Sequence, residues 1–478
     1  MQQLRVGYVG VAYRSYFAEE NDQYGRAMRG LEALSRELDF DLVAIPYGLT
    51  DMALTEQAAA ELRAQKIDLL LLQTAACALG EQIITLRDVA PYLGLWATPD
   101  PASEGPIQLH SFVSMSHYAS ILKRYLRHEE RSFKWFYGHV EEESFRRRFA
   151  VTVRSLAAIK KMAASRIGWV GGLSPGFYNM QFDERKLFAR FGLRVVAHEL
   201  GEVVEMAKAM NAADVAAVGG ELRLVAREVS TSSGALDKGA RLYLALKKLA
   251  EENGYNALAV ECWPKFQSLY GVAPCMAYSW LGSEDAMAVA CEGDVLGAAS
   301  MLLLNYLTGA SGSATLLDLA AIDPASATLL MWHCGVTPRH WANQDGVAWV
   351  DHTTLGRKSP TVYGVAGDLV FAPQTTTITY VGDDISRLLV LSARVVARAT
   401  KGFDGTRGWF SEFALNGEPI SMPDLVNTLI VRGHEHHYAV GQGDVSQELL
   451  ETAAWLKFQT VDRVPARDYL QVEGINVL

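Results

Sequence analysis

The chain has 478 residues, and its 44 Lys and Arg against 54 Asp and Glu give a formal net charge of 44 − 54 = −10. Hydrophobic residues make up 50% and charged residues 21%, a composition that excludes a disordered or fibrous protein. The acidic balance and the short basic runs exclude an extended nucleic-acid-binding surface, so we expect no nucleic-acid partner. At roughly 150 residues per domain, the length predicts about three domains.

Cysteine usage and hydropathy predict the compartment. The cysteines are odd in number and show no C-x-x-C spacing, which is typical of reduced thiols that pack as small hydrophobic residues in a cytoplasmic protein. The longest apolar stretch, 295–307, is shorter than the roughly 20 residues that a membrane span needs, and the N-terminus has no signal-peptide pattern. We therefore expect a cytoplasmic protein without membrane contact. The five cysteines are Cys77, Cys262, Cys275, Cys291 and Cys334.

The first part of the chain, residues 1–165, alternates short apolar runs with amphipathic stretches. The pattern predicts strands over 4–11, 41–46 and 68–72 and helices over 24–38 and 55–65. Continuous apolar strands separated by helices are typical of a parallel sheet that is covered on both faces. We expect one doubly wound α/β domain here.

A second α/β domain is expected over 166–345, because a new strand begins at 166 and runs into a glycine-rich turn. Further strands are predicted over 193–196, 257–261 and 286–290. The glycine-rich segment 171–176 lacks the G-x-G-x-x-G order of dinucleotide-binding loops. We therefore expect no nicotinamide cofactor.

The third part, 346–478, is rich in β-branched residues and Gly-Asp turns and predicts an antiparallel sheet or barrel. Strands are predicted over 361–365, 368–372, 375–381 and 388–397, and a helix over 447–457. The expected fold is therefore α/β, with two doubly wound (Rossmann-like) domains followed by a mostly antiparallel β-barrel-like domain.

Several metal-capable side chains stand at the ends of apolar runs: Glu292, Asp318, His333 and the cluster at 434–437. The apolar run before Glu292, the helix-like stretch 295–307 and the run ending at Asp318 predict one right-handed strand–helix–strand unit. In such a unit both carboxylates would lie at the carboxyl edge of one parallel sheet, where ligands bind. We expect His333 to arrive from the next strand and the histidine cluster from a loop of the β-rich domain.

Two carboxylates with two imidazoles make a mixed oxygen and nitrogen ligand set that suits manganese, cobalt or iron, and zinc less distinctively. Each residue also has a structural interpretation. Glu292 could complement a helix dipole, Asp318 could cap a turn, and His333 could be a hydrogen-bonded core residue. The three histidines within 434–437 could lie on a solvated loop.

At these segments the chain resembles the L-fucose isomerase and L-arabinose isomerase superfamily. Cys291-Glu292-Gly293-Asp294 with its following helix resembles that superfamily's metal-binding glutamate segment, and 433–437 resembles its glycine-rich double-histidine segment. Asp318 falls where the second carboxylate ligand lies, as in fucose isomerases, and His333 matches a histidine of arabinose isomerases. The stretch 408–417 resembles the one that precedes the ligand histidine in fucose isomerases.

The resemblance implies a metal-dependent aldose–ketose isomerase that acts through a cis-enediol on a free pentose, 6-deoxyhexose or C6-modified hexose. It implies a divalent metal, manganese first and cobalt, iron or zinc as alternatives, held by Glu292, Asp318, His333 and His437. Glu292 and Asp318 would also be the acid/base pair, and His436 would orient His437 or contact substrate. Members of the superfamily form homo-oligomers, so we expect one here.

The other candidate substrate-binding residues are polar or aromatic side chains that follow predicted strands or the glycine turn. Two of these candidates, Arg14 and Lys265, are positively charged, so an anionic sugar is also a candidate substrate. These candidates are Arg14, Tyr16, Tyr178, Asn179, Trp263 and Lys265. Two other functions stay open: a metal-dependent aldolase or hydrolase acting on a polyol, and a non-catalytic cytoplasmic sugar-binding protein.

Overall fold

The structure, a computed structural model, describes residues 3–128, 131–309, 314–352, 354, 364–382 and 384–471. The chain divides into two compact units, Met1–Lys160 and Lys161–Leu478, which are described separately below. The finer division at residues 165 and 345 stays a prediction. The observed α/β architecture with a mostly antiparallel C-terminal sheet confirms the expected fold class.

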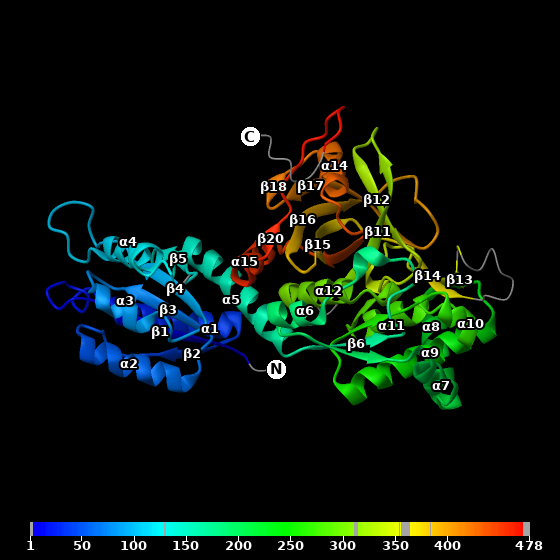
Figure 1. Ribbon diagram of the computed structural model, residues 1–478, viewed down its shortest axis with the longest axis horizontal. Helices are drawn as coiled ribbons and strands as arrows, with labels where there is room; N and C mark the ends of the chain where they lie inside the picture. The colour runs from blue at the N-terminus through cyan, green and yellow to red at the C-terminus, as the bar shows by residue number, and fades with distance from the viewer. Residues whose placement is uncertain are drawn as a thin grey trace. The chain divides into compact units, whose positions relative to one another are not determined.

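Unit 1 contains a parallel sheet in the order β2-β1-β3-β4-β5 with helices on both faces (Figure 1). Its strands are β1 Leu4–Val11, β2 Phe40–Ala44, β3 Leu69–Thr74, β4 Tyr92–Ala97 and β5 Lys134–Tyr137. Its helices are α1 Gln23–Leu38, α2 Met52–Gln65, α3 Gly80–Leu86, α4 Ser111–Ser120, the π-helical η1 Ile121–Tyr125, and α5 Glu143–Ala163, which crosses the unit boundary. Every residue of β3 is buried because helices cover both sides of the sheet.

Unit 2 begins with a smaller parallel sheet in the order β10-β9-β6-β7, so the carboxyl ends of β6, β9 and β10 lie side by side. Its strands are β6 Arg166–Val170, β7 Arg194–His198, β9 Ala257–Val260 and β10 Ala288–Ala290. The accompanying helices are η2 Tyr178–Met180, α6 Glu184–Phe191, α7 Leu200–Lys208, α8 Ala212–Val225, α9 Ser233–Asn253, α10 Lys265–Tyr270, α11 Cys275–Glu284, η3 Cys291–Gly293 and α12 Val295–Thr308.

The strands that follow in unit 2 form a barrel. They pair in the cyclic order β16-β15-β19-β11-β12-β17 and back to β16. These strands are β11 Thr315–Asp323, β12 Thr328–His333, β15 Gln374–Gly382, β16 Arg387–Val396, β17 Thr406–Leu415 and β19 His437–Gln442. The outlying elements are β8 Ala226–Val229, η4 Arg339–Trp341, β13 Val347–Asp351, β14 Val365–Val370, β18 Glu418–Pro419, α14 Met422–Val431, α15 Ser446–Leu456 and β20 Gln459–Thr460.

Helix α12 joins the two halves of unit 2. Its sequence is apolar on all sides, and it is buried along nearly its whole length because it packs against β10 on one side and against β15 and β19 on the other. The Ser300 hydroxyl accepts a hydrogen bond from the backbone N–H of Val381 in β15 at 2.9 Å. Helix α12 therefore links the carboxyl end of β10 to the barrel.

The expected strand–helix–strand unit is wrong in one respect. Strand β10 and helix α12 form as predicted, but β11, which contains Asp318, pairs antiparallel with β12 and β19 and belongs to the barrel. The periodicity of an apolar run does not distinguish a buried parallel strand from a barrel strand, since both are covered on two sides. Asp318 thus reaches the site from the barrel and not from the parallel sheet.

Smaller differences concern the third part of the chain. Helix α14 was not predicted, and the expected strand over 368–372 is β14, which begins earlier, at Val365. Most of the expected strand 361–365 lies outside the described residues. His437 is the first residue of β19 and not part of a loop.

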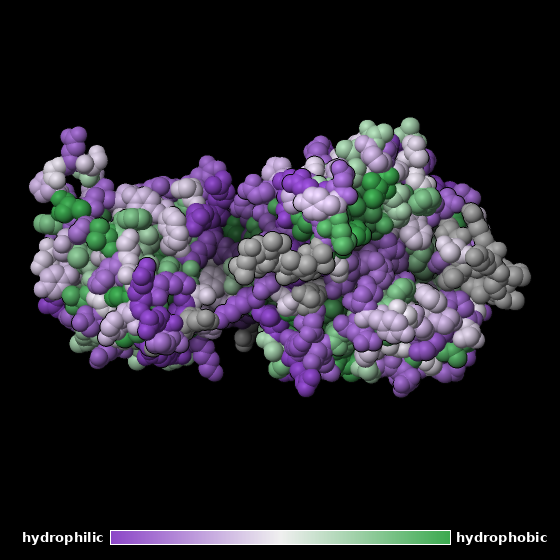
Figure 2. All heavy atoms as spheres, turned by 45° about the horizontal axis from the view of Figure 1, so that its top comes forward, coloured by the Kyte–Doolittle hydropathy of each residue, from purple (hydrophilic) through white to green (hydrophobic). Residues whose placement is uncertain are grey.

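The surface seen in Figure 2 is predominantly hydrophilic on both units, with smaller apolar groups between the polar ones, as expected for a chain with a net charge of −10. Among the described residues, no helix combines the length and apolarity that crossing a membrane requires.

Candidate active site

Glu292 is held by a backbone turn at the carboxyl end of β10. Its φ is +63°, a left-handed conformation that is rare for a residue with a side chain. The turn is fixed from β6 and the segment that follows it, because the N–H of Ser174 donates to the Glu292 carbonyl at 2.8 Å and the Trp169 indole donates to the Gly293 carbonyl at 3.0 Å. A Cβ on Gly293 would collide with the carbonyl of Gly172. The glycine-rich segment after β6 therefore supports this turn.

Asp318 and His437 are positioned by strand pairing. They lie directly opposite each other in the antiparallel register of β11 and β19. On the other side of β11, Asp318 is paired with Trp332, which places the next residue, His333, at the end of β12 beside the same space. The barrel thus presents one carboxylate and two imidazoles from neighbouring strands.

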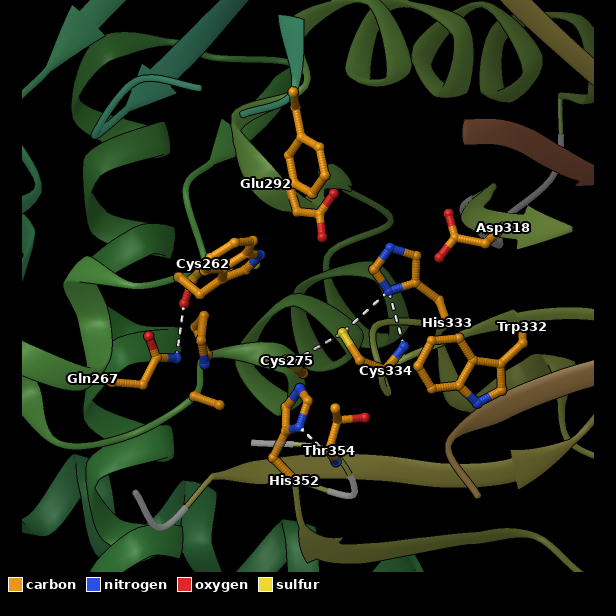
Figure 3. Close-up of a pocket in the computed structure, with 14 residues that line it drawn as sticks. Cys262, Gln267, Cys275, Glu292, Asp318, Trp332, His333, Cys334, His352 and Thr354 are labelled. Atoms are coloured by element: carbon orange, nitrogen blue, oxygen red, sulfur yellow. Dashed lines mark hydrogen bonds between the residues drawn. The ribbon is translucent and has the colours of Figure 1, made fainter. Parts of the chain in front are cut away.

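The structure brings Glu292, Asp318, His333 and His437 together, although they are far apart in the sequence. His437 Nε2 lies 3.1 Å from Glu292 Oε2 and 3.7 Å from Asp318 Oδ1, and the ring centroids of His333 and His437 are 5.8 Å apart. In Figure 3 the carboxylates of Glu292 and Asp318 and the ring of His333 point into one shared space.

Each of these side chains contributes a buried polar atom without an aligned hydrogen bond among the described residues. These atoms are Glu292 Oε2, Asp318 Oδ1, His333 Nε2 and His437 Nε2. Buried polar atoms are almost always paired, so four such atoms facing one space are typical of a binding site for a polar or charged ligand. Within the described part of the chain, the ligand atoms of Glu292, His333 and His437 lie within 4.8 Å of one another.

Asp294 supports the site from behind, a role that the sequence analysis missed. Its Oδ2 accepts a hydrogen bond from His437 Nδ1 at 2.8 Å, and its Oδ1 caps α12 by accepting from the N–H of Gly297 at 2.8 Å. The Tyr380 hydroxyl contacts both carboxylate oxygens at 2.9 Å. Because His437 Nδ1 donates to this carboxylate, the lone pair of a neutral His437 lies on Nε2, toward Glu292 and Asp318.

The two carboxyl groups have pKa values shifted in opposite directions. Burial opposes ionisation of Glu292, but the adjacent His436 and His437 outweigh it and lower its pKa to about 2. For Asp318 burial is the largest influence and raises the pKa, although the nearby histidines oppose it. Burial favours neutral His437, yet Asp294 and Glu292 raise its pKa well above the usual value. The two carboxylates beside His437 therefore favour a positive charge at this position.

A cavity of about 300 Å³ opens in front of these residues. Glu292, Asp318 and His333 line it together with the aromatic rings of Phe177, Trp263 and Trp332. The cavity is also lined by Ala273, by Pro274 and by six residues labelled in Figure 3: Cys262, Gln267, Cys275, Cys334, His352 and Thr354. Aromatic walls with a few convergent polar groups are typical of a site for a small polar ligand.

His436 is partly exposed and lies beside Glu292 and Phe177. Its Nδ1 is 3.1 Å from the Asn179 amide nitrogen, its ring packs 5.1 Å from that of Phe177, and its Nε2 is 4.0 Å from Glu292 Oε2. Asn179 and Trp263, two of the predicted substrate-binding residues, are thus beside the site.

The other predicted substrate-binding residues have different surroundings. Tyr178 is 78% exposed. Lys265 Nζ lies 2.8 Å from both the buried Glu261 carboxylate and the Gly171 carbonyl. Arg14 and Tyr16 belong to unit 1, where they line a separate pocket, and Arg14 pairs with Asp51 at 2.6 Å.

Comparison with known proteins finds no matching family profile but several relatives that share a name. A sulfoquinovose isomerase from Priestia aryabhattai is 27% identical over 407 residues, which cover 84% of this chain and 86% of that protein. Sulfoquinovose isomerases from Alkalicoccus urumqiensis and from Clostridium sp. strain MSTE9 are 26% and 28% identical over 375 residues, covering 77% and 76% of this chain. These similarities support an aldose–ketose isomerase that acts on a sugar.

Proposed function

We propose that this chain is a metal-dependent aldose–ketose isomerase whose substrate is a hexose with an anionic group at C6, with sulfoquinovose as the first candidate. The observation that carries the proposal is the convergence of Glu292, Asp318 and His437 from separate elements on one buried space. The names of the similar proteins support both the reaction and the sulfonated sugar. The resemblance to fucose and arabinose isomerases at the same residues supports the metal.

The residues present fit a divalent cation. Glu292, Asp318 and His437 would hold it, since each directs a buried atom without an aligned hydrogen bond into the same space. Asp294 fixes His437 as an acceptor on Nε2, as the carboxylate partner of a metal-bound histidine does. This oxygen and nitrogen donor set suits manganese. When bound, the cation would supply Lewis-acid stabilisation of negative charge on two sugar oxygens.

His333 differs from His437 in its hydrogen bonding. The backbone N–H of Cys334 donates to His333 Nδ1 at 2.9 Å, so Nδ1 is the acceptor and a neutral ring carries its proton on Nε2. A protonated Nε2 cannot bind a cation. We therefore assign His333 as a hydrogen-bond donor to a sugar oxygen, beside the three ligands.

Isomerisation through a cis-enediol moves one proton from C2 to C1 and another between the oxygens O2 and O1. Glu292 and Asp318 both line the cavity, and each lies within 4 Å of His437 Nε2. A carboxylate beside the bound sugar can take up and return a proton. We assign them as the pair that moves these protons. The aromatic walls formed by Phe177, Trp263 and Trp332 would exclude water from the enediol.

Incubating the purified chain with sugars in D₂O tests the reaction. The set should include glucose, fucose, arabinose, glucose 6-phosphate and sulfoquinovose, each with Mn²⁺ and again with excess chelator. We expect ketose formation with deuterium at C1, at least tenfold faster for sulfoquinovose than for glucose, and lost on chelation. Cleavage products would favour an aldolase or hydrolase. Sugar binding without turnover or metal dependence would favour a binding protein.

Lys265 is the candidate for recognising the anionic group, because it begins α10 between the cavity-lining residues Trp263 and Gln267 in the sequence and its ammonium, paired with Glu261, is half exposed. Replacing Lys265 by Gln should raise KM for sulfoquinovose about tenfold and leave KM for a neutral sugar unchanged. Lys248→Gln is the matched control, since Lys248 is an exposed helix residue paired with Glu252. Equal effects on charged and neutral sugars would contradict this role.

A further inference from the structure

The free cysteines are not scattered through the fold. Four of the five lie together in unit 2, and Cys77 lies in unit 1. Cys275 Sγ is 3.5 Å from Cys334 Sγ, and Cys291 interacts with the thiols of Cys262 and Cys334. The cluster is assembled from the end of β9, the start of α11, η3 and the end of β12, so it is a product of tertiary structure.

This cluster adjoins the candidate active site. Cys275 and Cys334 line the same cavity as Glu292 and Asp318, and in Figure 3 the Cys334 sulfur lies between the ring of His333 and Cys275. Cys334 Sγ is 3.1 Å from His333 Nδ1. A molecule small enough to enter the cavity therefore reaches a thiol that contacts both a second thiol and a site histidine.

We propose that Cys275 and Cys334 are a redox-sensitive pair whose reversible disulfide switches off the neighbouring site. The regulatory part rests on the proposed function, whereas formation of the disulfide does not. The sulfurs are already in contact at 3.5 Å and need to approach by only about 1.5 Å to reach the disulfide bond length of about 2.05 Å. Transient disulfides of this kind are typical of redox sensing in proteins whose cysteines are otherwise reduced.

The chemistry balances with a low-molecular-weight disulfide as the oxidant. The Cys334 thiol loses its proton and attacks one sulfur of the oxidant, which forms a mixed disulfide and releases one small thiol carrying that proton. Cys275 then attacks Cys334 Sγ, the mixed disulfide breaks, and a second small thiol leaves. The protein loses two hydrogens and two electrons, and the oxidant gains them. Cys334 is the first to react because it is more exposed than Cys275.

The disulfide would act on the site through His333. Cys334 directly follows this residue at the end of β12, and its backbone N–H sets the His333 tautomer. Pulling Cys334 toward α11 displaces that N–H and the thiol contact together. A displacement on the order of 1 Å at a positioned catalytic group can cost up to about 10²-fold in rate.

Treating the Mn²⁺-loaded enzyme with hydroxyethyl disulfide tests the proposal. We expect the free thiols, titrated after unfolding, to fall from five to three (5 − 2), and the mass to fall by about 2 Da, as for one internal disulfide. Peptide mapping should join Cys275 to Cys334. Isomerase activity should fall at least tenfold and return with dithiothreitol, and bound sugar should slow the reaction.

Two variants isolate the pair. Cys275→Ser removes the resolving thiol, so Cys334 should retain the mixed disulfide and the mass should rise by one mercaptoethanol adduct. Cys77→Ser changes the cysteine of unit 1 and should form the disulfide as the unmodified chain does. Unchanged thiols, a bridge between other cysteines, or full activity of the oxidised enzyme would overturn the proposal. A chain that forms the bridge but isomerises no sugar contradicts the proposed function alone, because thiol count and mass do not depend on turnover.

Discussion

The two sides of the candidate site are built in different ways. On the side of the parallel sheet, Glu292 is presented by a left-handed turn whose carbonyls are held by Ser174 and Trp169. On the barrel side, Asp318 and His437 are presented by two paired strands in which each residue has an ordinary extended conformation. One side thus depends on a strained backbone and the other on side-chain support.

This difference predicts where each side is vulnerable. The turn has no freedom to relax, because the backbone of Gly293 lies against that of Gly172. The backbone of the barrel strands is held by strand pairing. The orientation of the His437 ring depends instead on its hydrogen bond to Asp294, so a substitution of Asp294 should disturb that ring. A substitution in the turn should therefore mainly lower stability, whereas a substitution of the residue that supports His437 should mainly lower metal affinity.

The largest effect is expected for Glu292→Gln. The amide cannot transfer a proton and is a poor metal ligand, so activity should fall by about 10³-fold or more, and Mn²⁺ affinity should fall with it. Initial rates and isothermal titration with Mn²⁺ measure the two effects. Glu284→Gln is the matched control, because Glu284 forms an exposed pair with Arg339. Activity within tenfold of the unmodified chain would remove Glu292 from the site.

Gly293→Ala tests the backbone turn. The left-handed conformation at φ +74° and the collision with the Gly172 carbonyl should together lower the free energy of unfolding by about 2–4 kcal/mol. Gly176→Ala provides the comparison, since Gly176 has a similar φ of +92° and open space around its Cβ position. Urea unfolding should show a clearly smaller loss for Gly176→Ala. Equal losses would mean that the φ angle alone matters and that the close approach to Gly172 does not.

Asp294→Asn tests the support of His437. The amide no longer enforces a proton on His437 Nδ1, so Mn²⁺ affinity should fall about 10- to 100-fold while the fold persists. Asp345→Asn changes an exposed aspartate that pairs with Lys401 and should leave the affinity unchanged. If Asp294→Asn binds Mn²⁺ as tightly as the unmodified chain, His437 is not oriented for a metal by this contact.

The sequence predicted what depends on local pattern. Strand β1 and helix α12 follow directly from apolar runs and their boundaries, and Glu292 was expected at a strand end for the same reason. The pairing of Asp318 with His437 was beyond prediction, because the register of two barrel strands is set by the whole closed sheet. The wrong assignment of β11 to the parallel sheet has the same origin.

Residues with two roles were also hidden. Asp294 has the sequence position of a helix cap and is one, but only the structure shows that its second oxygen accepts from His437. Cys275 and Cys334 are separated by 59 positions, and each looks like a packing residue by itself. The local sequence pattern predicts only the secondary structure around each residue, whereas the second role of these residues depends on contacts between elements that are distant in the sequence.

The smallest expected effect contrasts two histidines of one segment. The His434 side chain is 4% exposed, and burial followed by the nearby charge of Arg387 lowers its pKa to about 3, the reverse of the shift at His437. In the unfolded chain the pKa of His434 returns to its ordinary value near 6.5. Between that pH and about pH 3 the unfolded chain therefore binds a proton at His434 that the folded chain does not bind. Stability from neutral His434 is complete above about pH 6.5 and is lost as pH falls toward 3.

Between pH 6.5 and 5 this linkage amounts to about 2 kcal/mol, from about 1.4 kcal/mol per pH unit. Replacing His434 by Phe keeps a ring between Tyr380 and Tyr438 and removes the titration. Urea unfolding at pH 7 and pH 5 should therefore show a smaller loss of stability for His434→Phe than for the unmodified chain, by about that amount. His128→Gln, at an exposed position, should keep the original dependence. Parallel curves for His434→Phe and the unmodified chain would show that His434 is protonated in the folded state.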